Sequence, residues 1–79
     1  MEPNIRRRLE DAAAELHPHR DSATGVDGAH ADVRSALDSE SAEGLGERLD
    51  RHAVELETSH PSLSTLIRTL VSDLSAMGI

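Results

Sequence analysis

The side chains most able to do chemistry in this chain are its histidines and the carboxylates near them. The 79 residues include five histidines and fifteen Asp or Glu. Asp27 with His30, and Glu57 with His60, are carboxylate-x-x-His pairs, a spacing that places both side chains on one helical face. Paired Glu-x-x-His motifs build di-iron sites in helical bundles, but such sites also need two further inward-pointing glutamates, and zinc needs three or four convergent ligands. We therefore expect no metal and no cofactor, and we keep Glu57 and His60 as candidate ligands for a metal-binding alternative.

The other histidines add no convergent ligand set. His17 and His19 flank a proline in a stretch expected to be a loop, and His30 and His52 are expected to face water.

Catalytic motifs are also missing from the pattern. The serines include no Gly-x-Ser-x-Gly elbow, and the glycines do not have the spacing of a phosphate-binding loop. Phe, Tyr and Trp are absent, which leaves little material to line a small-molecule pocket. We expect a protein that is not an enzyme and has no catalytic residues.

The element with the strongest periodicity is the C-terminal stretch. Its large apolar residues recur at steps of three and four, which predicts an amphipathic helix over residues 61–77. These residues are predicted to form its interaction face: Leu63, Leu66, Ile67, Leu70, Val71, Leu74 and Met77.

A second row on this helix consists of small side chains. Thr65, Thr69, Ser72 and Ala76 also share a helical face, where an acidic protein would be expected to carry carboxylates. Small side chains let another helix approach closely, so Thr65, Thr69 and Ser72 are candidate contacts to a partner chain. The alternative is that these short side chains simply face water.

The ends of this helix have recognisable signals. Pro61 suits a first helical turn, and the residue before a proline avoids helical geometry, so either Ser59 or His60 is expected to cap the helix. Gly78 can close the helix in the left-handed conformation, with Ile79 folding back as in a Schellman motif.

The whole chain is predicted to be one all-α domain, a small bundle of three to four helices with a flexible loop at residues 18–28. Ser59-His60-Pro61 must either break or kink the chain. A break would fold the last two helices into an antiparallel hairpin with their apolar stripes in contact. The predicted helices cover residues 3–16, 29–39, 45–58 and 61–77.

An arginine triplet in the first helix could suggest nucleic-acid binding. Arg6 and Arg7, however, have carboxylates four residues ahead, Glu10 and Asp11, at ion-pair spacing. The net charge of −7 also opposes phosphate binding. We interpret the triplet as a solvated face and expect no nucleic-acid partner.

The composition favours a salt-rich cytoplasm. All eight basic residues are arginine, and the excess of carboxylates with few bulky apolar residues resembles the composition of haloarchaeal proteins. We expect a cytoplasmic location, since no signal or lipidation motif is visible, and no membrane span, because Arg68 and Asp73 interrupt the apolar stretch.

Self-association would compensate for a small core. The chain has no Cys for disulfides and no aromatic residues, and a core of this size supplies roughly 3–5 kcal/mol. We therefore expect a homo-oligomer, in the simplest case a dimer.

The C-terminal half resembles a known family. Leu45-Gly46-Glu47-Arg48-Leu49, the turn Glu57-Thr58-Ser59-His60-Pro61, and the ending Met77-Gly78-Ile79 are similar to the bacterial and archaeal domain of unknown function DUF4404. The resemblance implies a short, acidic, helical protein. It implies no activity, and it hardly extends to residues 18–44.

Three functional hypotheses follow. The first is a small interaction or scaffold module that self-associates through its C-terminal helix. The second is a metal-binding helical protein that uses His60 and nearby carboxylates. The third is a small regulatory partner that docks on a larger protein by its apolar stripes.

The acidic composition yields a first prediction. Removing salt should loosen the fold, because the Debye length grows from about 3 Å at 1 M salt to about 30 Å at 0.01 M and exposes the chain to its own charge repulsion. Helical circular dichroism should fall between these two conditions. An unchanged spectrum would contradict the prediction.

Overall fold

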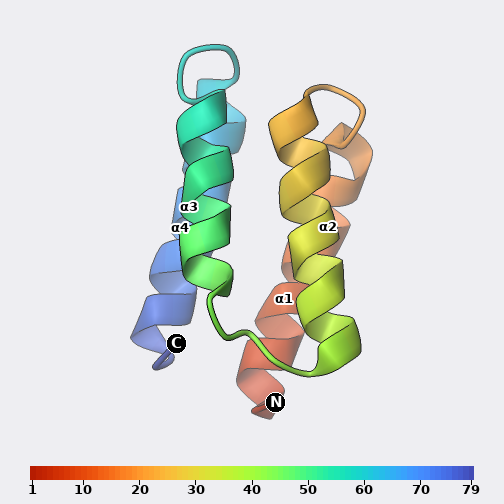
Figure 1. Cartoon of the computed structure of the whole chain (residues 1–79), viewed down its shortest axis with the longest axis vertical. Helices are drawn as coiled ribbons and strands as arrows, with labels where there is room; N and C mark the ends of the chain where they lie inside the picture. The colour runs from red at the N-terminus through yellow and green to blue at the C-terminus, as the bar shows by residue number, and fades with distance from the viewer.

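The computed structural model describes all 79 residues and contains helices but no strands. The expected all-α bundle is therefore confirmed, with four α-helices and one short 3-10 helix (Figure 1). Their bounds are α1 Pro3–Leu16, η1 His17–His19, α2 Thr24–Ser39, α3 Leu45–Leu56 and α4 Pro61–Ala76.

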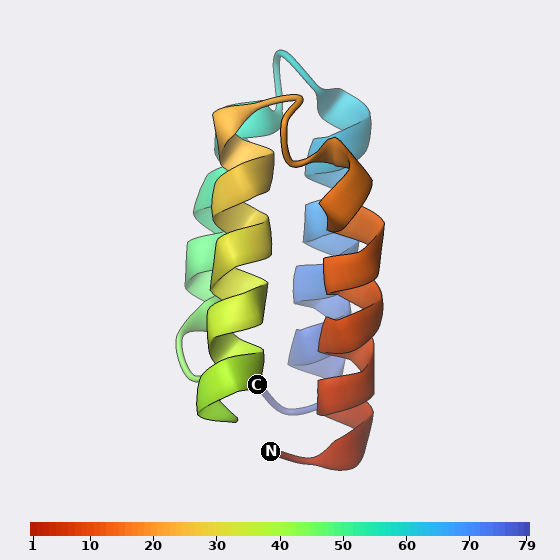
Figure 2. The ribbon, with the colours of Figure 1, turned by 90° about the vertical axis from the view of Figure 1, so that its right-hand side faces the viewer.

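The helices form two antiparallel hairpins that lie side by side. Figure 1 shows α1 behind α2 and α4 behind α3, and Figure 2 shows the same rods from the side, with both chain termini at one end. The contact between α2 and α3 joins the two hairpins, whereas α1 and α4 touch each other only sparsely. The bundle is about 33 Å long.

The core is built from small and aliphatic side chains. All four helices contribute to one cluster of 18 buried apolar residues, and six of these are alanines. Leu9, Leu16, Leu45, Leu49 and Leu70 are fully buried within it. Because alanine leaves the helix surface almost flat, the helices can approach closely without aromatic side chains to fill the space between them.

The second helix begins earlier than predicted. It starts at Thr24 rather than at residue 29, and His17–His19 forms a 3-10 helix, so the loop predicted at 18–28 shrinks to a turn. The loop prediction was wrong because Gly25 and Gly28, although glycine usually favours loops, lie inside α2. A Cβ atom on Gly25 would lie 3.0 Å from Cγ of Leu56, and one on Gly28 would lie 2.6 Å from Cε1 of His52. The glycines therefore allow α2 to pack closely against α3.

The chain breaks between α3 and α4, as the hairpin prediction required. The two helices end two residues and one residue earlier than expected, at Leu56 and Ala76. His60 occupies the N-cap position of α4, but its side chain caps no amide group. Its Nδ1 lies 3.1 Å from the Ser59 Oγ instead, so the expected capping role of the His60 side chain is wrong.

The C-terminus of α4 has the predicted Schellman motif. Gly78 has a φ of 91°, and its N–H donates to the Ser75 carbonyl at 3.1 Å. The Ile79 N–H donates to the Leu74 carbonyl at the same distance. These bonds satisfy carbonyls in the last turn of the helix, and the Leu74 carbonyl also accepts from the Met77 N–H.

The C-terminus of α2 ends in Glu40, which adopts a left-handed backbone conformation that is unfavourable for a residue with a Cβ atom. Glu40 has a φ of 54° and is the only non-glycine residue with a positive φ. Its N–H donates to the carbonyls of Ala36 and Leu37. Its side chain forms an exposed ion pair with Arg6, with 3.2 Å between Oε1 and Nη1. A left-handed conformation costs a residue with a Cβ about 1 kcal/mol, and an exposed ion pair recovers less than that.

The substitution Glu40→Gly should therefore raise the free energy of unfolding by about 0.5–1 kcal/mol, because glycine adopts the left-handed conformation without strain. Urea denaturation in molar salt measures the change. Glu40→Ala is the matched control, since it loses the same ion pair but keeps the strain. If the alanine variant were as stable as the glycine variant, strain at this position would not be the cause.

Candidate functional site

The apolar face of α4 divides into a buried part and an accessible part. Ile67, Leu70 and Leu74 are at most 1% exposed and belong to the core of the chain itself. In the single chain, therefore, only part of the interaction face predicted from the sequence can be reached by a partner. The other four residues of that face are only partly buried against the core, and they can be reached from outside: Leu63, Leu66, Val71 and Met77.

A buried serine in α4 links it to α3. Ser64 is 3% exposed, and its hydroxyl donates to the Ala53 carbonyl across a distance of 2.7 Å. Ala53 lies in the last turn of α3, where carbonyls lack intrahelical donors. Ser64 thus acts as a cap supplied by the neighbouring helix. Sequence reasoning missed it, because a serine three residues before Ile67 interrupts the apolar pattern and gives no sign of its partner.

The small-residue row of α4 faces solvent in the single chain. Thr65, Thr69, Ser72 and Ala76 are all exposed. The Thr65 hydroxyl donates to the Pro61 carbonyl of its own helix at 3.0 Å. This side of α4 is therefore open to water or to a second molecule.

A groove runs beside this row, between α4 and α1. Its volume is about 400 Å³, and Ala76 and Met77 form part of one wall. Arg8 and Asp73 span it with an ion pair of 2.9 Å between Nε and Oδ2. Arg8 also lies 3.8 Å from a Glu15 carboxylate oxygen. The remaining lining residues come from the outer flank of α1, and they are Asn4, Arg7 and Asp11.

Charges of both signs remain unpaired in this groove. Arg7 and Asp11 form no ion pair, although their spacing predicted one, and Arg6 pairs with Glu40 rather than with Glu10. The groove therefore combines an accessible apolar side chain, small side chains, a free guanidinium and a free carboxylate.

The metal candidates do not come together. Glu57 Oε2 lies 3.4 Å from the Arg68 guanidinium, and His60 faces Ser59, so the two side chains have separate partners. No three His, Asp or Glu side chains in the chain converge on one point where they could hold a metal ion.

His30 lies against another histidine rather than pairing with Asp27. The ring centroids of His17 and His30 are 5.7 Å apart, at the junction of η1 and α2. Partial burial lowers the pKa of His30, and the positive charges of Arg20, His17 and Arg34 lower it further, while Asp27 acts in the opposite direction. The spacing of Asp27 and His30 in the sequence did not reveal this arrangement.

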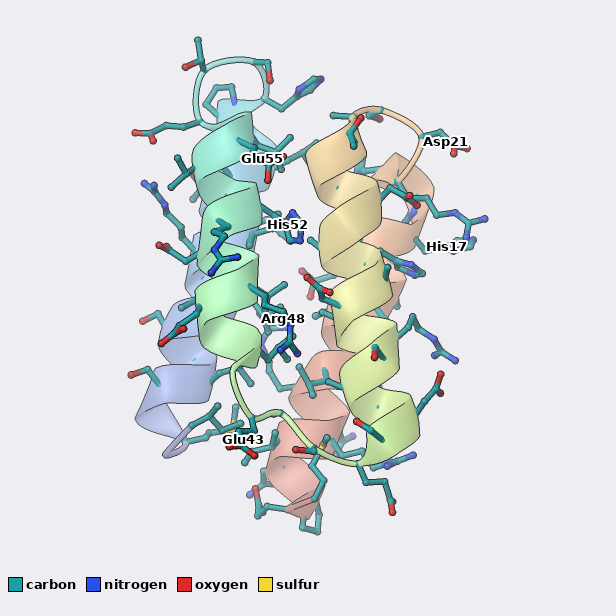
Figure 3. The ribbon with its side chains drawn as sticks, viewed as in Figure 1. His17, Asp21, Glu43, Arg48, His52 and Glu55 are labelled. Atoms are coloured by element: carbon teal, nitrogen blue, oxygen red, sulfur yellow. The ribbon has the colours of Figure 1, made fainter.

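A second arrangement missed from the sequence lies between α2 and α3. Figure 3 shows Arg48 and His52 pointing from α3 toward α2. The His52 Nε2 is 2.8 Å from Asp32 Oδ2, and Arg48 Nε is 3.9 Å from the other oxygen. The His52 side chain is 21% exposed, and its Nδ1 is buried without a hydrogen-bond partner. His52 is thus not the surface residue that was expected, and its bond to Asp32 connects the two hairpins.

Comparison with family models finds a match to the domain of unknown function DUF4404 over residues 5–79. The match includes the middle of the chain, which the resemblance read from the sequence hardly covered. No curated protein and no solved structure matches the chain. None of the helices has the length and apolar character that crossing a membrane requires.

The Ser64 contact yields a prediction about stability. Ser64→Ala should lower the free energy of unfolding by about 1 kcal/mol, because it leaves the Ala53 carbonyl without this donor. Ser62→Ala is the matched control, since Ser62 is exposed on the same helix and should change stability by less than about 0.5 kcal/mol. Denaturant unfolding of both variants measures the difference, and equal stabilities would show that the hydrogen bond is not important.

Proposed function

The chain belongs to the DUF4404 family, and we propose that it is a small non-enzymatic interaction module that pairs with a second copy of itself through the groove between α1 and α4. The observation that carries the proposal is the open side of α4. There, partly buried Leu66 and Met77 lie next to an exposed row of small side chains.

The shape of this surface suits a helix as its occupant. Ala76 and Met77 line the groove, and Thr69 lies two turns earlier on the same side of α4 as Ala76. Small side chains allow a second backbone to come close, and the apolar side chains behind them would then be removed from water. An α4 helix from another copy presents the same combination.

The charges in the groove support a second copy rather than an unrelated partner. In a two-fold symmetric dimer each copy contributes the same patch, so the patch must be complementary to itself. Arg7 and Asp11 line the groove without an ion pair. In a two-fold dimer, Arg7 of one copy could pair with Asp11 of the other, and Asp11 with Arg7. Such pairs contribute orientation and specificity more than affinity.

The small core supplies a further reason for association. Eighteen buried residues without a single aromatic side chain form a modest core for a bundle of four helices. Covering Leu66 and Met77 with a second copy would add apolar burial at about 25 cal/mol per Å².

High salt should favour the proposed association. Each copy carries a net charge of −7, so two copies repel each other in dilute buffer. At about 1 M salt this repulsion is screened beyond about 3 Å, while groups in direct contact are less affected. The acidic composition thus supports placing the module in a salt-rich cytoplasm.

Sedimentation equilibrium in molar salt should show a dimer that dissociates as salt is removed. Thr69→Gln should weaken dimerisation about tenfold or more, because a long side chain keeps the second helix away from the surface, and about 1.4 kcal/mol corresponds to tenfold in affinity. Ser35→Gln is the matched control, since Ser35 is an exposed hydroxyl residue on α2, away from the groove.

Circular dichroism of both variants separates loss of pairing from loss of folding. A wild-type chain that stays monomeric in molar salt at high concentration would contradict the proposed function. Equal weakening by Thr69→Gln and Ser35→Gln would also contradict it, because the contact would then lie elsewhere.

A further inference from the structure

A second surface, where the end of α1 meets η1 and α2, gathers positive charge in an otherwise acidic molecule. An open cleft of about 500 Å³ lies between the end of α1, η1 and α2. Ala13 and Ala14 form its floor, and the small size of these side chains leaves the space open. Its polar lining consists of His17, Arg20, His30, Arg34 and one carboxylate, Glu10.

The two arginines of this cleft have no acidic partner in the chain. Arg6, Arg8, Arg48 and Arg68 all form ion pairs, whereas neither Arg20 nor Arg34 has a carboxylate oxygen within 4.0 Å. Arg7 and Arg51 also form no ion pair, but only Arg20 and Arg34 line the same cleft. The fold therefore holds two free guanidinium groups beside two imidazole rings.

We propose that this cleft binds a small oxyanion of the phosphate class, held by Arg20 and Arg34 with His17 and His30 as additional donors. A guanidinium group presents N–H donors in a planar fork that fits the oxygens of such an anion. His30 and Arg34 are four residues apart on α2 and so lie on one face, while His17 and Arg20 approach from η1 and the turn after it. The cleft is open on one side, so a phosphate with a small organic group attached fits the same chemistry.

The histidines make the binding dependent on pH. Burial and the nearby positive charges of Arg20, His17 and Arg34 lower the pKa of His30, and Asp27 and Glu10 are the negative groups that face this region. The lowered pKa favours the neutral ring, so His30 contributes stability above about pH 6.5 that is lost as pH falls through its folded pKa. A bound anion stabilises the protonated ring and raises this pKa. Anion affinity should therefore increase as pH falls.

Sulfate is the best first probe, because its charge stays constant across this pH range. Chloride would be replaced by sulfate at constant ionic strength, and the ring protons of His17 and His30 would be followed by NMR. We expect saturable shifts at both rings, an upward shift of the His30 pKa, and tighter binding near pH 6 than near pH 8. Inorganic phosphate and glycerol phosphate, each added at one fixed pH, test whether the free ion or the organic ester binds more tightly.

Charge-matched variants separate a defined site from general screening. Arg34→Gln and Arg20→Gln should each weaken sulfate binding about three- to tenfold, as expected for loss of one charged donor at a partly exposed site. Arg51→Gln is the control, since Arg51 is an exposed arginine on α3 that also lacks an ion pair. The proposal is overturned if sulfate shifts the rings no more than chloride does, or if Arg51→Gln weakens binding as much as the cleft variants.

Discussion

The close contact between α2 and α3 is the constraint on which the rest of this structure depends. It joins two helical hairpins that share little surface elsewhere, because α1 and α4 touch only sparsely. Without aromatic side chains, the space between helices must be filled by Leu, Ile, Val and Ala, which requires short distances between the helix axes. Gly25 and Gly28 supply that short distance, since a Cβ atom at either position would crowd Leu56 or His52. The bond between Asp32 and His52 can form across the same contact because the backbones lie so close.

The two hairpins pack closely where α2 meets α3, and the contact between α1 and α4 on the other side is more open. With the hairpins held together through α2 and α3, the long side chain of Arg8 links α1 to α4 at the surface by reaching Asp73, while both helices contribute to the single apolar core. An ion pair with one partner about half exposed contributes little stability by itself. It does set the width of the groove and leaves Met77 accessible at its edge. The proposed pairing surface is thus a geometric consequence of how the core is closed on the other side.

Periodicity and end signals predicted the parts of the fold that depend on local sequence. The bounds of α1, the hairpin of α3 and α4, and the closing turn at Gly78 all follow from interactions within a few residues. The errors concern contacts between distant residues. The sequence does not distinguish a glycine in a turn from a glycine that packs against a neighbouring helix. For this reason Gly25 and Gly28 were assigned to a loop rather than to α2. Local ion-pair spacing failed for the same reason, because Arg6 has a better-placed partner in Glu40, which follows α2. The Ser64 bond and the pairing of His17 with His30 also required the tertiary structure.

The two proposed surfaces both include residues of α1 but meet different neighbours: the groove lies toward α4, and the cleft lies toward η1 and α2. Arg7 and Asp11 line the groove, where Arg8 is the side chain that reaches α4, whereas Glu10, Ala13 and His17 line the cleft beside α2 and η1. Residues three or four apart share a helical face, whereas consecutive residues do not. The three consecutive arginines of α1 therefore cannot all line one surface. Four of the eight arginines form no ion pair. Arg7 lines the groove, Arg20 and Arg34 line the cleft, and Arg51 lies exposed on α3. No residue lines both surfaces, so each proposal can be tested with variants that leave the other lining unchanged.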